Sequence, residues 1–209
     1  RTTGILMSSI ADDRLNKLKE GVIYHFNVDH DKNKLYEESV SCRYSAINNR
    51  NLERYRKFLK EKDAKYGVES EDKDWFEKQN DWKVSTRLDM TPSMEAYRLH
   101  EVFKEVLEIE DMGPRFMTQK EGTDVKYHVD RETKCAINFL VRGVQTPISF
   151  KNIGSFYYDT ALIDSSFLHA VPSQTGGDRV LFKLRINDMT YNEAKEKLIA
   201  KGIVRKLGN

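Results

Sequence analysis

The pattern of hydrophobic and polar positions along the chain changes character near residue 113. Before that point apolar residues recur mostly with helical spacing, and long charged stretches separate them. After it, short runs rich in Val, Ile, Phe and Tyr follow one another. The pattern predicts a helical and strand region over 1–113, a β core over 114–187, and a C-terminal helix and tail over 188–209. Together they form one structural domain.

Eight short strands are predicted in the core, with turn residues between them. Their sequences are RFMTQ, VKYHVD, CAINFLV, TPISFK, SFYYD, TALID, SFLHAV and RVLFKLRI. Because no helical pattern interrupts them, they favour an antiparallel sandwich or barrel over a parallel sheet. The expected fold class is α+β with a mainly β core.

The region before the core carries mixed signals. Residues 11–21 and 50–66 are expected to form helices. Residues 21–28 and 34–47 are expected to form two strands, joined by the polar turn DHDKNK. The acidic segment 68–83, which contains both tryptophans, is expected to be a loop near the mouth of the barrel.

Two further helices are indicated by capping residues. Thr91 is a suitable N-cap and Pro92 a suitable first-turn residue for an amphipathic helix over 92–110. Near the end of the chain, Thr190 and Glu193 have the spacing of a capping box. We expect that second helix to pack outside the β core.

The candidate chemistry begins with His128 and Asp130, which lie two residues apart in the predicted strand VKYHVD. Side chains alternate between the faces of a strand, so both point the same way and can bind the same ion. By itself this pair is equally typical of an exposed ion pair. His169, in the apolar strand SFLHAV, is the candidate for a third ligand, although a histidine in such a strand is ordinarily structural.

Arg179 lies ten residues after His169, at the start of a strand that otherwise suits burial. Arginine is rarely buried without a partner. A cation beside an open metal site is suited to binding the far carboxylate of a dianionic co-substrate. Lys183 and Arg185 share the face of Arg179 by alternation, so either of them is an alternative for this role.

Two histidines and one carboxylate on one face of an octahedral ion form the facial triad of non-haem Fe(II) oxygenases. Three positions then remain for a chelating 2-oxo acid and O₂. Zinc favours sites with more nitrogen or sulfur ligands, and no cysteine lies where it would complete one. Iron is therefore the expected metal of His128, Asp130 and His169.

This ordered set resembles the 2-oxoglutarate/Fe(II)-dependent dioxygenases over roughly residues 114–187, most of all the small aspartyl/asparaginyl hydroxylase-like and phage-type members. The resemblance implies a double-stranded β-helix (a cupin-like jelly roll) braced by helices. It implies oxidative decarboxylation of 2-oxoglutarate to succinate and CO₂, coupled to hydroxylation of a C–H bond. It also implies that Asn138 lines the co-substrate pocket. The R-x-S pattern common in the family is absent, because Val180 and Leu181 follow Arg179. The presence of Asp130 argues against halogenation, since halogenating members usually lack this carboxylate.

Composition limits the partners. The 35 basic and 33 acidic side chains leave a net charge of +2, which gives no electrostatic case for nucleic acid. No apolar run approaches the roughly 20 residues of a membrane span. Cys42 and Cys135 form no C-x-x-C pair, which indicates a reduced, intracellular (cytoplasmic) protein. The expected substrate, besides O₂, is an amino-acid side chain, free or in a peptide.

Two other interpretations remain open. One is a cupin-like metal-binding protein or isomerase without oxygenase activity, which has no need of Arg179. The other is a structural jelly-roll protein, which has no need of the three ligands to converge. A second polar cluster, made of His25, Asp29, His30 and Asp31, falls in the predicted turn and is interpreted as part of it.

Overall fold

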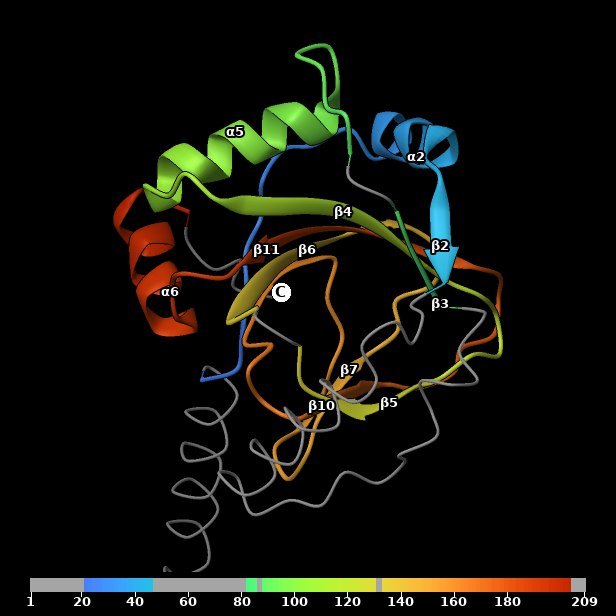
Figure 1. Cartoon of the computed structure of the whole chain (residues 1–209). Coiled ribbons are helices and arrows are strands. Elements are labelled where there is room, and N and C mark those ends of the chain that lie inside the picture. The colour runs from blue at the N-terminus through green and yellow to red at the C-terminus, as the bar shows by residue number, and fades with distance from the viewer. Residues whose placement is uncertain (1–20, 47–81, 86–87, 131–132, 204–209) are drawn as a thin grey trace, which may run out of the picture.

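In the computed structural model, residues 21–46, 82–85, 88–130 and 133–203 are described (Figure 1). Two antiparallel sheets face each other, and helices cover the outer face of the larger one. The helix expected over 50–66 and nearly all of segments 11–21 and 68–83 lie outside the described residues.

The larger sheet has seven strands in the order β1-β9-β6-β11-β4-β3-β2. They are β1 (Ile23–His25), β9 (Thr160–Ile163), β6 (Cys135–Arg142), β11 (Arg179–Ile186), β4 (Met112–Gln119), β3 (Trp82–Ser85) and β2 (Tyr44–Ala46). The smaller sheet has the order β5-β10-β7-β8. Its strands are β5 (Val125–His128), β10 (His169–Val171), β7 (Ile148–Phe150) and β8 (Gly154–Phe156). The eight predicted core strands correspond to β4 to β11, so the mainly β core is confirmed.

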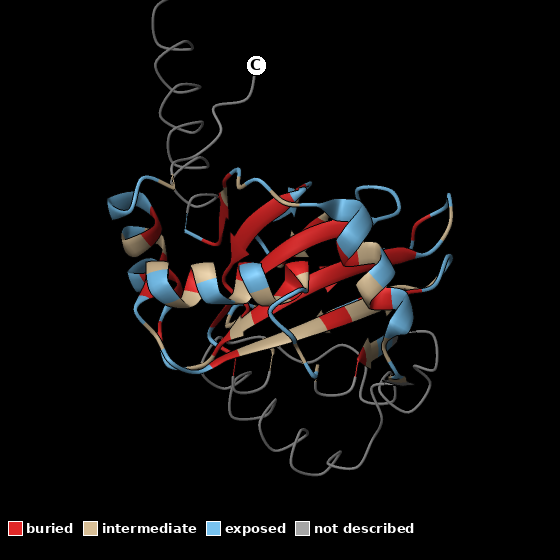
Figure 2. Ribbon diagram, turned by 90° about the horizontal axis from the view of Figure 1, so that it is seen from above, coloured by how far each residue is buried: buried red, intermediate tan, exposed pale blue. Residues whose placement is uncertain are grey.

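The larger sheet separates two hydrophobic clusters, and alternation along β11 shows how. Phe182 and Leu184 lie in the cluster beneath the helices, together with Phe103. Leu181 packs in the other cluster, between the sheets, with Phe150. Figure 2 shows the buried strands beneath a helix whose outer face is exposed. Every second residue of β11, from Arg179 on, therefore faces the interior between the sheets.

The strand expected over 34–47 is wrong for most of its length. Lys32–Ser41 form helix α2, and only Tyr44–Ala46 form a strand. The side chain of Asp31 accepts a hydrogen bond from the amide of Lys34 at 3.0 Å and so caps the helix. The buried residues Leu35 and Ser39 are four apart, which matches a helix face.

Helix α5 (Glu95–Leu107) lies inside the predicted range 92–110 but begins later than expected. Its N-cap is Met94, without a side-chain cap, while Thr91 and Pro92 belong to a preceding turn. The cap comes instead from α2. The carboxylate of Glu38 accepts hydrogen bonds from the amides of Glu95 and Ala96, at 2.6 and 3.0 Å.

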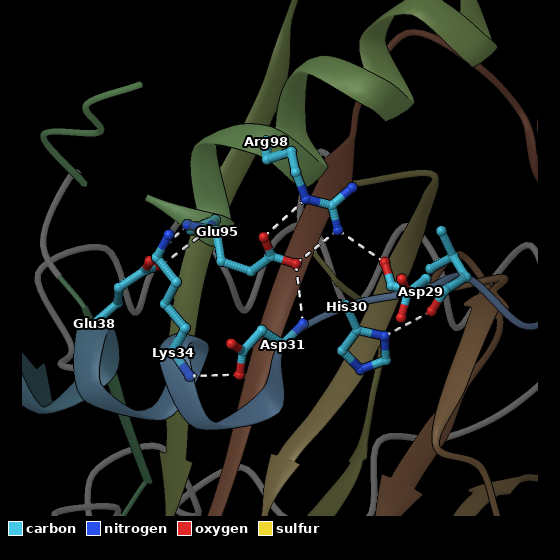
Figure 3. A network of polar contacts seen from close by, with 9 residues as sticks. Asp29, His30, Asp31, Lys34, Glu38, Glu95 and Arg98 are labelled. Carbon is cyan, nitrogen blue, oxygen red and sulfur yellow. Dashed lines mark hydrogen bonds and ion pairs between the residues drawn. The ribbon is translucent and has the colours of Figure 1, made fainter. Parts of the chain in front are cut away.

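Figure 3 shows that this contact belongs to a larger polar network between α2 and α5. Glu95 is buried and accepts hydrogen bonds from the amide of Asp31, at 3.1 Å, and from Arg98, at 2.6 Å. Arg98 also donates to the carbonyl of Asp29. The bond from Arg98 lowers the pKa of Glu95. The network fixes the first turns of the two helices against each other.

Replacing Glu38 with alanine should destabilise the protein by about 1–2 kcal/mol, because two amides of α5 lose their carboxylate partner. Alanine favours helices, so α2 itself is not weakened. For a chain of this length we expect Tm to fall by about 4 °C in a thermal melt. Glu37→Ala, at an exposed position of the same helix, is the matched control and should stay within about 0.5 kcal/mol of wild type. Equal melting of both variants would contradict the capping role.

Helix α6 (Tyr191–Ala200) begins with the predicted capping box, formed by Thr190 and Glu193. Its buried residues Ala194 and Leu198 join the cluster that holds α5, so it packs on the outer face of the larger sheet. None of the helices in the described ranges combines the length and apolar character needed to cross a membrane.

Candidate metal centre

The structure brings together His128, Asp130 and His169. His128 ends β5, His169 begins β10, and the two residues are direct partners across these antiparallel strands. Their rings lie 4.4 Å apart between centroids. Asp130 follows β5 and places Oδ1 at 3.6 Å from Nε2 of His128. One ligand atom from each residue lies within 4.8 Å of the others, which is the spacing of a metal site.

Backbone carbonyls fix the orientation of both imidazoles. Nδ1 of His128 lies 2.8 Å from the carbonyl oxygen of Lys126, and Nδ1 of His169 lies 2.8 Å from that of Phe167. A carbonyl oxygen only accepts, so each Nδ1 carries the hydrogen. In a neutral ring the lone pair is then on Nε2. Metal-binding histidines are oriented in this way by their second nitrogen.

The protonation states suit a cation. Burial, with repulsion from His128, lowers the pKa of His169 to about 3, so this ring is neutral near pH 7. Burial alone would raise the pKa of Asp130. The charge of Lys183 and the contact with His128 outweigh it and hold this pKa well below its usual value. The centre therefore offers a neutral imidazole and a carboxylate without a change of protonation.

Lys183 forms an ion pair with Asp130, one of the three residues of this centre. Its ammonium group donates to Oδ2 of Asp130 at 2.5 Å, and the residue is 9% exposed. The bond leaves Oδ1 of Asp130 on the side of His128. The charge of Lys183 is thus compensated by a carboxylate, which weakens its candidacy as the clamp of a co-substrate.

Arg179 has a different environment. It is 1% exposed and donates to the hydroxyl of Tyr158 at 2.7 Å and to Oε1 of Gln119 at 3.3 Å. Its Nε is buried and lacks a hydrogen-bond partner. Among the described residues, no carboxylate pairs with this guanidinium. Within the described part of the chain, Arg179 is therefore a buried positive charge without a compensating carboxylate.

Asn138 lies between Lys183 and the contact of Arg179 with Tyr158. It lies opposite Lys183 on the neighbouring strand β6, and its Nδ2 donates to the hydroxyl of Tyr158 at 3.2 Å. Its Oδ1 is buried and also lacks a partner. Between Lys183 and Arg179, the interior therefore holds two buried polar atoms that the described protein atoms do not satisfy.

Sequence reasoning did not identify the partners of Arg179. Nothing in the sequence singles out Tyr158 or Gln119 as these partners. The neighbouring Tyr157 is 61% exposed. A buried arginine requires acceptors, but their identity depends on which strands pair.

The alternative cluster near residue 30 is structural. His30 bonds to the carbonyl of Val28 through Nδ1, and Asp31 caps α2. Within the described ranges, the centre formed by His128, Asp130 and His169 is the one group of His, Cys, Asp or Glu side chains that has metal-site spacing.

No family model and no curated protein matches the chain. Similar solved structures include a prolyl-4-hydroxylase from Pseudomonas putida, with 11% identity and a TM-score of 0.41 over 75% of this chain and 98% of that one. A cupin domain from Schizosaccharomyces pombe has 10% identity and a TM-score of 0.36, over 63% and 77% of the two chains. The DMSP lyase DddQ from Ruegeria pomeroyi has 12% identity and a TM-score of 0.32, over 37% of this chain and only 39% of the lyase. All three TM-scores are low, so these similarities carry no information on function.

Proposed function

We propose that this chain is a non-haem Fe(II)- and 2-oxoglutarate-dependent oxygenase that hydroxylates an amino-acid side chain, free or in a peptide. The observation that carries the proposal is the uncompensated guanidinium of Arg179, buried in the same interior as a two-histidine, one-carboxylate centre. A site that binds only a metal has no use for this charge.

The strand order supports a double-stranded β-helix. From β4 to β11 the chain passes repeatedly between the sheets, with β4, β6, β9 and β11 in the larger one and the others in the smaller. Eight antiparallel strands in two facing sheets are the composition of a jelly roll, a fold that includes the cupins.

The donor set fits Fe(II). Two imidazole nitrogens and one carboxylate oxygen on one side of an ion leave the opposite positions open, as in the iron oxygenases. His128, Asp130 and His169 would hold the metal, with Lys183 fixing the second oxygen of Asp130. The bound iron would supply the activation of O₂ that oxidises the co-substrate and the C–H bond.

The residues of the chain would bind and orient the co-substrate. Arg179 would bind the far carboxylate of 2-oxoglutarate, since charge-assisted bonds to a guanidinium are strong and directional. The hydroxyl of Tyr158 and the amide of Asn138 lie beside it and would line the chain of the co-substrate. The buried apolar cluster between the helices and the larger sheet would keep water from this side of the site.

The test is anaerobic addition of Fe(II) and 2-oxoglutarate, followed by the weak visible charge-transfer band of the chelate. The proposal predicts the band with 2-oxoglutarate but not with succinate, which lacks the keto oxygen. His169→Ala and Asp130→Ala should abolish it. Asp124→Ala, which removes an exposed carboxylate just before β5, is the matched control and should keep it.

The same experiment separates the rival function. A cupin-like metal-binding protein or isomerase would bind iron, detected by calorimetry, without forming the band. A structural protein would show neither signal, and either result would overturn the proposal.

A further inference from the structure

Two arginines lie beside the candidate metal centre and have no role in it. Arg115 on β4 is the direct cross-strand partner of Lys183, and Arg185 lies two residues beyond Lys183 on β11. By alternation all three share the face that looks between the sheets. Arg185 leans across β4, because its Cδ lies 4.0 Å from the point where a Cβ on Gly113 would stand.

Neither guanidinium has a carboxylate partner among the described residues. Nε of Arg185 donates to the hydroxyl of Thr133 at 2.8 Å, which leaves its two terminal nitrogens for other acceptors. Burial, and then the charge of Arg185, lower the pKa of Arg115. Both residues are half-buried. Two like charges held together at a partly dehydrated surface are unfavourable unless an anion joins them.

Arg185 lies on the side of Lys183 away from Arg179 along β11, and Arg115 lies beside Lys183 on the neighbouring strand β4. Along β11, Arg179 precedes Lys183 by four residues, about 13 Å at the usual rise, while Arg185 follows it by about 7 Å. Lys183 lies beside the metal centre, because it donates a hydrogen bond to Asp130. A co-substrate that extends from the metal toward Arg179 therefore leaves the arginine pair to another molecule.

We propose that Arg115 and Arg185 bind an oxyanion of the prime substrate, a carboxylate or a phosphate, and so orient its carbon chain toward the metal. The inference rests on the proposed function and gives it a substrate class. For an amino-acid substrate the anion is the main-chain carboxylate, which makes a free amino acid, or the last residue of a peptide, the expected form. Guanidinium groups suit this role because they offer paired donors to planar or tetrahedral oxyanions.

The first test uses inorganic phosphate as the probe, titrated into the metal-free protein by calorimetry at low ionic strength, where charge interactions are least screened. We expect one phosphate to bind. Each of Arg115→Gln and Arg185→Gln should weaken this binding by about tenfold, the usual effect of losing one charge-assisted bond.

Two controls locate the anion. Arg142→Gln removes an arginine that stacks on Tyr36, at 4.2 Å from its ring, and should leave phosphate binding unchanged. Arg179→Gln should also retain it. If Arg179→Gln abolishes phosphate binding while Arg115→Gln and Arg185→Gln do not, the inference is overturned, and absence of phosphate binding overturns it too.

Competition then identifies the source of the anion. Displacement of phosphate by free L-amino acids, but not by their amides, assigns a carboxylate, and displacement by glycerol 3-phosphate alone assigns a phosphate monoester. The outcome is independent of the chelate band. If the band forms but phosphate binding does not depend on the two arginines, the proposed oxygenase function stands and this inference is wrong. If phosphate binds through the arginines but the band does not form, the anion site stands and the protein has another function.

Discussion

Replacing Arg179 with methionine should make the metal-free protein more stable and weaken the binding of 2-oxoglutarate to the metal-loaded protein. The guanidinium is 1% exposed, and its acceptors among the described residues, Tyr158 and Gln119, are both neutral. An apolar side chain of similar volume avoids the desolvation of this charge, so we expect a gain of about 1–2 kcal/mol and a Tm higher by about 4 °C. Loss of the bond to the co-substrate should weaken 2-oxoglutarate binding by about 3 kcal/mol, roughly a hundredfold in Kd.

The matched control lies on the same strand. Lys183→Met also removes a buried cation, but one that is paired, and it leaves Asp130 without its partner. We expect that variant to lose about 3 kcal/mol of stability. Thermal melts and calorimetric titration of 2-oxoglutarate into the metal-loaded variants give both quantities. Destabilisation by Arg179→Met as large as that by Lys183→Met would show that the charge of Arg179 is structural.

Acidification should destabilise the metal-free protein well before its carboxylates titrate. His169 has a pKa of about 3 in the folded state, below the 6.5 of an exposed histidine. Between these values the unfolded chain binds a proton that the folded chain does not. The stability that depends on the neutral ring is therefore complete above pH 6.5 and falls with pH, by about 1.4 kcal/mol per unit, until the folded-state pKa is reached.

Between pH 6.5 and 4.5 this group alone should remove about 2.3 kcal/mol from the free energy of unfolding. Urea denaturation at several pH values measures the slope. His169→Gln should lower the slope of the free energy of unfolding against pH by the equivalent of nearly one proton. The contributions of the other histidines remain in both proteins. Parallel slopes for the two proteins would mean that His169 is solvated and protonates in the folded state.

The strands of the core could be predicted from sequence because each one is decided locally. In β11, for example, the alternation of Val180, Phe182 and Leu184 with Arg179, Leu181 and Lys183 defines two faces without knowledge of any neighbour. The pairing of strands is not local. Nothing in the runs around residues 158 and 119 indicates that both would reach Arg179.

The first part of the chain was harder to predict for the same reason. In residues 34–47 the apolar residues alternate loosely, and the decisive signal, Asp31 as the cap of α2, lies within the segment interpreted as a turn. The start of α5 is set by Glu38, which is 57 residues away in sequence. When the cap of a helix comes from another helix, the sequence next to the capped helix does not indicate it.

The convergence of His128, Asp130 and His169 could be predicted because the first two lie two residues apart and His169 lies ten residues before a buried arginine. Lys183 could not be assigned from sequence, since alternation gives it the same face as Arg179 and Arg185. Its bond to Asp130 depends on where the chain turns after β5.

The two halves of the candidate site rest on scaffolds of unequal strength. Arg179, Lys183 and Asn138 come from eight-residue strands in the centre of the sheet that the helices brace, whereas the histidines come from strands of three and four residues. Short strands with few neighbours open most readily in the native state. The half that holds Arg179 is thus the more stable one, and amide exchange in β5 and β10 should slow most when a metal binds to both strands.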